Sequence, residues 1–489
     1  MLADEFNKYT KSQEFKDLLA RYEQVLLDNG NEFFDANDLL DIAEYYYSKH
    51  DVDAAIQACY YCLDLYPDND RALVFIARSA IFSGDYTTAE RIAKSIKFDE
   101  ELEVVYLRAE LMLINSESDK AEEYLTKHFL SLPEDDDQRY DMALDVPHLY
   151  CDYSCWQLAE KWLQLLENDG QKEEMDYVEA MARIYANTDR HKEAIPYWNK
   201  YIDENSFSSN AWISLAQCQY QTGQCQEALQ SAEYAIAINP DMPDGYLAAG
   251  NAYFAMGRGQ DSIDMFEKFL DLLPGDAQGE LLLSCVYFSE GKNEEAKVHI
   301  DNAINAIRDL TEDDVPVFVF HEIYRQAAFV YGSLGEMAQA NTYVDYLLFY
   351  GMEETTVKML RAAVYLEGKH QNDAFTLFSE LLDEHKNDPK VYIKIGMMLV
   401  DSNYFALGYK VLGSTLVILE ESGMPSPNGW DRLAYAALME NQYDDFLEAL
   451  EKSIEYLPTE TVTIFSPYFP DDMPIEQYLA YAKEHRINP

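Results

Sequence analysis

The sequence predicts an all-α fold, a right-handed superhelical solenoid of about twelve antiparallel helix pairs. Three observations predict it. Glycines recur at a fixed step of 34 residues, at Gly223, Gly257 and Gly291. Hydrophobic residues make up 48% of the 489 residues, which excludes a largely disordered chain. Gly and Pro number only 20 and 16, a mix that favours packed helices over sheets with many tight turns.

Each recurring residue type has a physical role in a pair of helices. Gly ends the first helix, because the chain reverses through a left-handed conformation that penalises a Cβ. Pro240 and Pro274 end the second helix, because Pro has no N–H and clashes with the preceding turn. Large residues such as Trp212 fill the space between the two helices, and small ones such as Ala228 mark their crossing. A fixed period of this length is the signature of stacked units.

This pattern resembles the tetratricopeptide repeat. The family signature of an aromatic residue, Leu-Gly and Tyr, followed by Ala, Phe, Ala and Pro, falls on three consecutive central units. Weaker units extend the resemblance over about residues 36–458. It departs from the pattern at 140–174, where Pro147 holds the close-packing position, so a distorted unit is expected there.

The predicted organisation has four parts. Caps are expected at both ends, because terminal faces of a solenoid would otherwise expose core. The extra residues between units after 308 predict a break, and aromatic and β-branched residues around Val462 and Phe465 predict an extended run before a final helix. The parts are a capping helix in 1–35, a repeat array in 36–308 that is most regular at 209–308, a second array in 309–458, and an extended aromatic segment with a capping helix in 459–489.

The charge of the chain is strongly negative, −52 from 37 basic and 89 acidic residues. Such a surface repels phosphates and anionic membranes, so neither nucleic acid nor a membrane is an expected partner. Two interpretations of the charge stay open: plain solubility, or attraction to a basic protein partner. The first residues lack the basic and apolar regions of a signal peptide, and the seven Cys do not form a disulfide framework. A cytoplasmic location is expected.

No motif in the sequence predicts catalysis, a cofactor or a metal. Phosphate-binding glycine loops, HExxH and GxSxG are all missing. Cys59 and Cys62 fall where the repeat needs small core residues, and no second pair completes four ligands. His148, Cys151 and Cys155 come closer to the spacing of zinc ligands, but they lack a fourth. The protein is therefore not expected to be an enzyme, with a metal-dependent enzyme as the least favoured alternative.

The resemblance implies that a peptide lies on the concave face formed by the first helices. Projected onto the central units, this face is apolar and rich in amides; the alternative is that about half of these residues are ordinary core. Some family members clamp a C-terminal carboxylate with Lys and Asn, but Ile213 and Leu247 stand at the Lys positions here, so that mode is not expected. The predicted peptide-binding residues are Ile213, Gln217, Tyr220, Leu247, Asn251, Phe254, Leu281 and Phe288.

Three arginines on predicted first helices, Arg71, Arg78 and Arg183, are candidates for binding an anion. Equally, they could pair with neighbours such as Glu103, Glu110 or Glu179. The leading functional hypothesis is a scaffold or adaptor that binds a peptide or helix of a partner protein. The alternative is a structural or self-assembling helical module.

Overall fold

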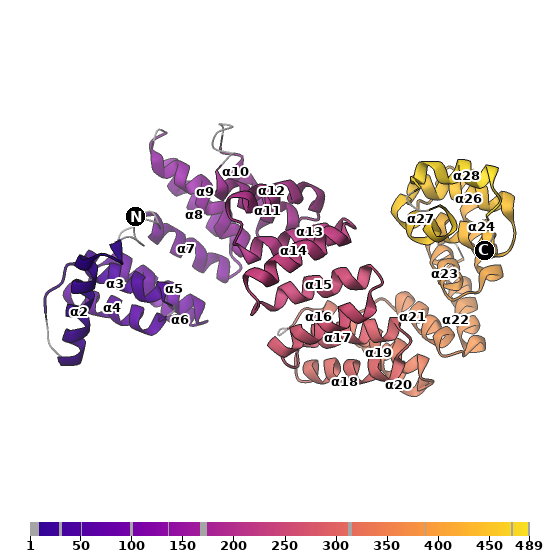
Figure 1. The fold of residues 1–489 in the computed structure, drawn as a ribbon, viewed down its shortest axis with the longest axis horizontal. Coiled ribbons are helices and arrows are strands. Elements are labelled where there is room, and N and C mark those ends of the chain that lie inside the picture. Colours follow the sequence, from indigo (N-terminus) through magenta and orange to yellow (C-terminus); the bar gives the residue numbers. More distant parts are fainter. Residues whose placement is uncertain are drawn as a thin grey trace. The chain divides into compact units, whose positions relative to one another are not determined.

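The computed structural model describes residues 9–28, 32–49, 51–97, 101–134, 136–166, 174–311, 315–386, 388–470 and 473–487. Its regular structure in those residues consists of helices, with no strand (Figure 1). The chain forms two compact units, Met1–Ile238 and Asn239–Pro489, called unit 1 and unit 2 below. The all-α helix-pair fold predicted from the sequence is confirmed.

The helices described in unit 1 start with α2 and continue as consecutive helix pairs. Within each pair the two helices pack on one another. A second helix also packs on the first helix of the next pair, as α4 does on α5 and α12 does on α13. The helices are α2 (Gln13–Asp28), α3 (Ala36–Ser48), α4 (Val52–Leu65), α5 (Asp70–Phe82), α6 (Tyr86–Ser95), α7 (Leu102–Ile114), α8 (Ser118–Ser131), α9 (Asp137–Asp152), α10 (Trp156–Leu163), α11 (Met175–Asn187), α12 (His191–Glu204), α13 (Ser209–Gln221) and α14 (Cys225–Ile238).

Unit 2 has the same arrangement of pairs and ends in short helices. Its helices are α15 (Pro243–Ala255), α16 (Gly259–Leu272), α17 (Ala277–Ser289), α18 (Asn293–Ile307), α19 (Val317–Ser333), α20 (Met337–Phe349), α21 (Glu354–Glu367), α22 (Gln371–Glu384), α23 (Pro389–Asp401), α24 (Phe405–Glu421), α25 (Trp430–Met439), α26 (Tyr443–Tyr456), α27 (Pro458–Phe465), η2 (Ser466–Tyr468), η3 (Ile475–Gln477) and α28 (Tyr478–Glu484).

From the pair of α5 and α6 to the pair of α25 and α26, the turn inside the pair passes through a left-handed residue. Gly223, Gly257 and Gly291 have φ of +78°, +70° and +71°, as predicted for residues that end the first helix. Where no Gly stands at this point, another residue adopts the same conformation at the same place in the pair. These residues are Ser116, Ser154, Asp189, Lys369, Asn403 and Asn441. The turn geometry is therefore a property of the repeat rather than of glycine.

Close packing of the two helices in a pair depends on small residues. A Cβ built on Gly250 of α15 would lie 2.4 Å from Cε1 of Phe266 in α16, whose ring is fully buried. The Ser262 hydroxyl donates a hydrogen bond to the carbonyl of Gly250 at 2.9 Å. The backbones can approach this closely only because neither position carries a bulky side chain.

The regions in which the sequence departs from the 34-residue period, 140–174 and the residues after 308, also contain helices. α9 runs through Pro147, which is buried inside the helix, and its partner α10 has only eight residues. α19 begins directly after Pro316 and extends over 17 residues. The division between the two units falls between Ile238 and Asn239. The break expected after 308 stays a prediction.

The two ends of the array are covered by additional helices. α2 buries Phe15 and Tyr22 completely, and the Phe15 ring lies 5.2 Å from that of Tyr45 in α3. The extended run expected after 458 is wrong: Pro458–Phe465 is the helix α27. Pro458 occupies its first turn, and Thr461 and Phe465, one turn apart, are both fully buried. The burial of these two side chains on one helical face outweighs the β-branched composition.

Candidate functional site

The first helices of unit 1 form a continuous layer. α5, α7, α9 and α11 contact one another in succession, and the Tyr47 ring of α3 lies 5.7 Å from the Phe75 ring of α5. The exposed side of α3, α5, α7, α9 and α11 is called the first-helix face of unit 1 below. The sequence-based expectation of a partner surface on first helices concerns this face and its counterpart in unit 2.

Polar contacts tie neighbouring helices of this face together. The Tyr106 hydroxyl of α7 donates a hydrogen bond to Asp145 of α9 at 3.1 Å. The Arg183 guanidinium of α11 donates to Asp152 of α9 at 2.6 Å. Each contact joins one first helix to the next, so the layer is held by side chains as well as by packing.

The three arginines predicted to bind an anion lie on this face, and two of them form ion pairs. Arg78 Nε is 3.9 Å from Glu110 Oε2, one of the neighbours named from the sequence, and Arg183 pairs with Asp152. Arg71 is exposed on α5, and its charge offsets part of the rise that burial and neighbouring acids cause in the pKa of Asp41 on α3. An external anion would compete with carboxylates that already hold these cations.

Carboxylates outnumber cations on the first helices of unit 1. The described residues of α3, α5, α7, α9, α11 and α13 include twelve Asp and Glu but five Arg. The surrounding protein reduces hydration of Asp145 and raises its pKa, and the negative charges of Asp141 and Asp176 raise it further. The same causes, with Glu44 as the nearest acid, raise the pKa of Asp41. The face therefore carries negative charge that its own side chains do not neutralise.

The predicted peptide-binding residues divide between the two units. In unit 1, Ile213 is buried with 6% of its surface exposed, Gln217 is exposed, and Tyr220 is partly buried, which raises its pKa. Ile213 is therefore a core residue of α13. A peptide could contact it only if the helix moved. The amide of Gln217 has no hydrogen-bond partner among the described residues.

In unit 2 the remaining five predicted residues are all partly exposed. Leu247 and Phe254 of α15 pack beside the buried Phe266. Leu281 and Phe288 of α17 pack against the next core cluster, so these four apolar side chains are shared between core and surface. Asn251 lies between Leu247 and Phe254 on one stripe of α15, and within the described part of the chain its amide has no hydrogen-bond partner.

The comparisons agree with this architecture. Residues 179–243, which run from α11 to the start of α15, match the model of the tetratricopeptide repeat family. The match identifies tetratricopeptide-repeat sequence in this part of the chain. Such repeats generally mediate protein–protein interaction and scaffolding. No curated protein matches the sequence significantly.

Several solved tetratricopeptide structures are similar to this chain. An APC/C hetero-tetramer is 14% identical with a TM-score of 0.41, over 94% of both chains. YrrB, titled a TPR protein with an unusual peptide-binding site, is 18% identical with a TM-score of 0.31, over 40% of this chain and 95% of its own. A protein from Thermus thermophilus is 20% identical with a TM-score of 0.32, over 39% and 97%.

The cysteines and the histidine considered as metal ligands have other environments in the helix pairs. Cys59 and Cys62 are buried in α4, and burial raises the pKa of Cys59 to about 12. His148 Nε2 lies 2.9 Å from the carbonyl of Asp176, and Cys151 is buried with its pKa raised by burial to about 12. In the described residues, no group of three or more His, Cys, Asp or Glu side chains is arranged to hold a metal ion.

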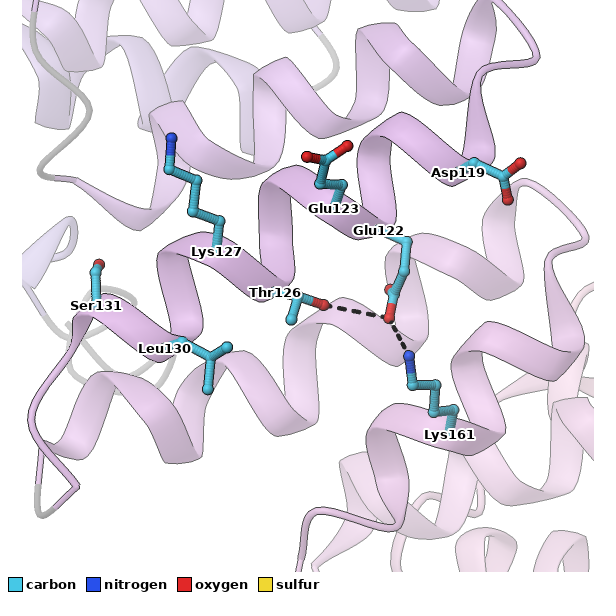
Figure 2. A pocket seen from close by; sticks show the side chains of 8 residues that line it. All are labelled: Asp119, Glu122, Glu123, Thr126, Lys127, Leu130, Ser131 and Lys161. Carbon is cyan, nitrogen blue, oxygen red and sulfur yellow. Dashed lines mark hydrogen bonds and ion pairs between the residues drawn. The ribbon is translucent and has the colours of Figure 1, made fainter.

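A shallow groove of about 620 Å³ lies along α8 beside α10 (Figure 2). Glu122 of α8 points toward Lys161 of α10 and accepts a hydrogen bond from its ammonium group at 2.6 Å. It also accepts from the Trp162 indole at 2.8 Å and from the Tyr150 hydroxyl of α9 at 2.7 Å. Burial would raise the pKa of Glu122, but these donors hold it below its usual value. The carboxylate thus links three helices, and we assign it a structural role.

Two features of the first-helix face were not predicted from the sequence. Asp141, Asp145 and Asp176 come together from α9 and α11, and Phe82 ends α5 with 91% of its surface exposed. The aromatic feature has a signal in the sequence, since Phe75 and Phe82 are seven residues apart on one stripe of α5. The group of three aspartates has no such signal in the sequence, because Asp and Glu occur throughout this chain.

Within the described residues, no helix combines the length and the apolarity that crossing a lipid bilayer requires.

Proposed function

We propose that this tetratricopeptide repeat protein is a scaffold or adaptor that binds a peptide or helix of a partner protein on the first helices of its repeats. The observation that carries the proposal is Asn251 of α15. Its amide is partly exposed and has no partner among the described residues, and Leu247 and Phe254 flank it one turn before and after. This combination supports peptide binding, because an amide can both donate to and accept from a peptide backbone.

The apolar neighbours supply the second half of the interaction. Leu247 and Phe254 are already fixed on their inner sides by the core around Phe266. A partner side chain that covers their outer sides would bury apolar surface without ordering them further, so little conformational entropy is lost. Leu281 and Phe288 of α17 would extend the same surface to the next repeat.

A capture experiment tests the proposal. The full chain and an N251E/F254E variant are used to recover proteins from native lysate, and the recovered proteins are identified. We expect the variant to lose partners that the wild type retains. The partner would bury positions 251 and 254, and the two new carboxylates would have to be buried without a compensating charge. A V298E/Q339E variant is the matched control, since it adds the same charges at exposed positions of α18 and α20. Recovery of the same partners by all three proteins would overturn the proposed surface.

We also place the protein in the cytoplasm. All seven cysteines are free thiols, and Cys155, Cys225 and Cys285 are partly exposed. A reducing compartment preserves such thiols. Fractionation of cells with an antibody against the chain tests this location.

A further inference from the structure

An aromatic patch lies at the α5 end of the first-helix face of unit 1. It consists of Tyr47, Phe75 and Phe82, with Tyr47 55% and Phe82 91% exposed and the Tyr47 and Phe75 rings 5.7 Å apart. Phe75 and Phe82 lie on the stripe of α5 that also carries Arg71 and Arg78. Single exposed apolar side chains are ordinary, but a group of aromatic ones on one face marks a surface that a partner covers.

An acidic strip continues from this patch across the next helices. Arg78 joins the two, because it lies on the α5 stripe and reaches Glu110 of α7. Among the described residues, Arg or Lys pairs with two carboxylates of the strip, Glu110 and Asp152. The strip consists of Glu103 and Glu110 of α7, Asp141, Asp145 and Asp152 of α9, and Asp176 and Glu179 of α11.

The centre of the strip carries charge that nothing in the described chain pairs. Asp141, Asp145 and Asp176 form no ion pair with Lys or Arg among the described residues. Asp145 accepts one hydrogen bond, from the neutral Tyr106 hydroxyl. Burial is the largest cause of the raised pKa of Asp145, and the negative charges of Asp141 and Asp176 raise it further. His148 acts in the opposite direction. An approaching cation would be attracted by all three carboxylates at once.

We propose that the first-helix face of unit 1 binds a cationic segment of a partner protein, with Lys or Arg over the acidic strip and an apolar or aromatic anchor on the aromatic patch. This inference rests on the proposed function and names the chemistry of the partner. Charge complementarity supplies the attraction and the register. The aromatic rings bury the anchor and also accept cations on their faces.

The other surfaces of the protein fit a cationic segment less well. The first helices of unit 2 carry seven acidic against six basic residues in the described chain, so their charge is nearly balanced. The second helices of unit 2 are more acidic, with nineteen acidic against four basic residues in the described chain. Their exposed aromatic residues, Tyr346 and Phe349, lie on α20. The one acid of that helix, Asp345, is already paired with Arg361. Charge and aromatic anchor coincide on the first-helix face of unit 1.

Binding of a synthetic peptide to the full chain tests the proposal. The probe is a fluorescein-labelled peptide of alternating Lys and Ser with one central Trp, and its companion has every Lys replaced by Gln. Fluorescence anisotropy gives the Kd of each. We expect the Lys peptide to bind and the Gln peptide to bind at least about tenfold more weakly.

Variants locate the site. D141N/D145N/D176N removes three charges, while the amide oxygen introduced by D145N still accepts the hydrogen bond from Tyr106. This variant is expected to weaken binding of the Lys peptide by about tenfold or more. D264N/E267Q/D271N removes three charges from α16 and is expected to leave the Kd within about twofold. F82S is expected to weaken binding about fivefold, since it removes one ring of the aromatic patch that receives the anchor and changes no charge.

Three results would overturn the inference. The wild type could fail to bind the Lys peptide, or the two triple variants could lose affinity equally, which would mean general attraction to an acidic protein. In the third result, light scattering would show a molar mass that rises with protein concentration in the wild type but not in F82S. The aromatic patch would then be a contact between two copies of this chain. Loss of partners by N251E/F254E, combined with any of these results, would leave the proposed function standing without the cationic partner.

Discussion

The two units build the same helix pairs but use charge and glycine differently. In unit 1 the acids lie on both helices of a pair, and side chains such as Glu122 and Arg183 tie successive helices together. In unit 2 the first helices are nearly balanced in charge, and most acids are on the second helices. Helical glycines, including Gly250 and Gly396, occur only in unit 2 among the described helices.

This difference teaches that one backbone arrangement can be stabilised in two ways. Small residues let helices approach, so the pair gains dispersion and apolar burial. Charged hydrogen bonds bridge neighbouring helices through their side chains, at the cost of desolvating the charges. The second solution leaves carboxylates on the first-helix face, and this is the reason that unit 1, and not unit 2, offers an acidic surface.

The largest expected effect concerns close packing in unit 2. Gly250→Ala should reduce the free energy of unfolding by about 2 kcal/mol, because its Cβ would overlap the buried Phe266 ring. Urea denaturation followed by circular dichroism measures it. Gly413→Ala is the control: the nearest atom to its Cβ is 3.7 Å away, so the helix gains up to about 1 kcal/mol. Equal effects of the two changes would contradict the packing role of Gly250.

The next effect concerns the charged tie in unit 1. Glu122→Gln should cost about 2 kcal/mol at pH 7, because Lys161, Trp162 and Tyr150 lose a charged acceptor. The folded-state pKa of Glu122 is below its unfolded value of 4.5, so the stabilisation is complete above pH 4.5 and is lost as the pH falls through the folded pKa.

Urea denaturation at pH 7 and near pH 4 should therefore show a smaller difference between Glu122→Gln and the wild type at the lower pH. The exposed neighbour Glu123→Gln serves as the control and should change stability by less than about 0.5 kcal/mol. A difference for Glu122→Gln that stays constant with pH would argue against the ionised carboxylate as its source.

Binding to the two proposed surfaces should depend differently on salt concentration. Raising NaCl from about 50 to about 300 mM should weaken binding of the Lys peptide about tenfold, because the charges of the acidic strip are exposed and screened. Partners that depend on Asn251 and Phe254 should be recovered almost equally at both salt concentrations. Capture assays and anisotropy at the two concentrations measure this, and parallel salt dependence would erase the distinction between the units.

The smallest effect is common to both units. Ser116→Gly in unit 1 and Lys369→Gly in unit 2 should each raise the free energy of unfolding by up to about 1 kcal/mol, because both residues have positive φ. Gly335→Ala, at the equivalent turn with φ +77°, should lower it by about the same amount. Thermal melts of the three variants measure these shifts, and an unchanged Tm for all three would mean that these turns carry no strain.

The sequence by itself determined the helix pairs, because local chemistry decides them. Gly223, Gly257 and Gly291 end first helices, Pro240 and Pro274 follow second helices, and Gly250 sits where backbones approach. Each of these effects acts between residues that are near in the chain or one pair apart. A fixed step of 34 residues therefore predicted the fold class.

Only the tertiary structure decided the rest. Thr461 and Phe465 belong to a helix because both are buried on one face, although their neighbours favour an extended run. Ile213 is core rather than surface, and Arg78 and Arg183 are held by Glu110 and Asp152. The meeting of Asp141, Asp145 and Asp176 depends on which helices stack side by side. The charge and burial of these residues depend on neighbours that are distant in the chain. The periodicity of the sequence therefore does not predict them.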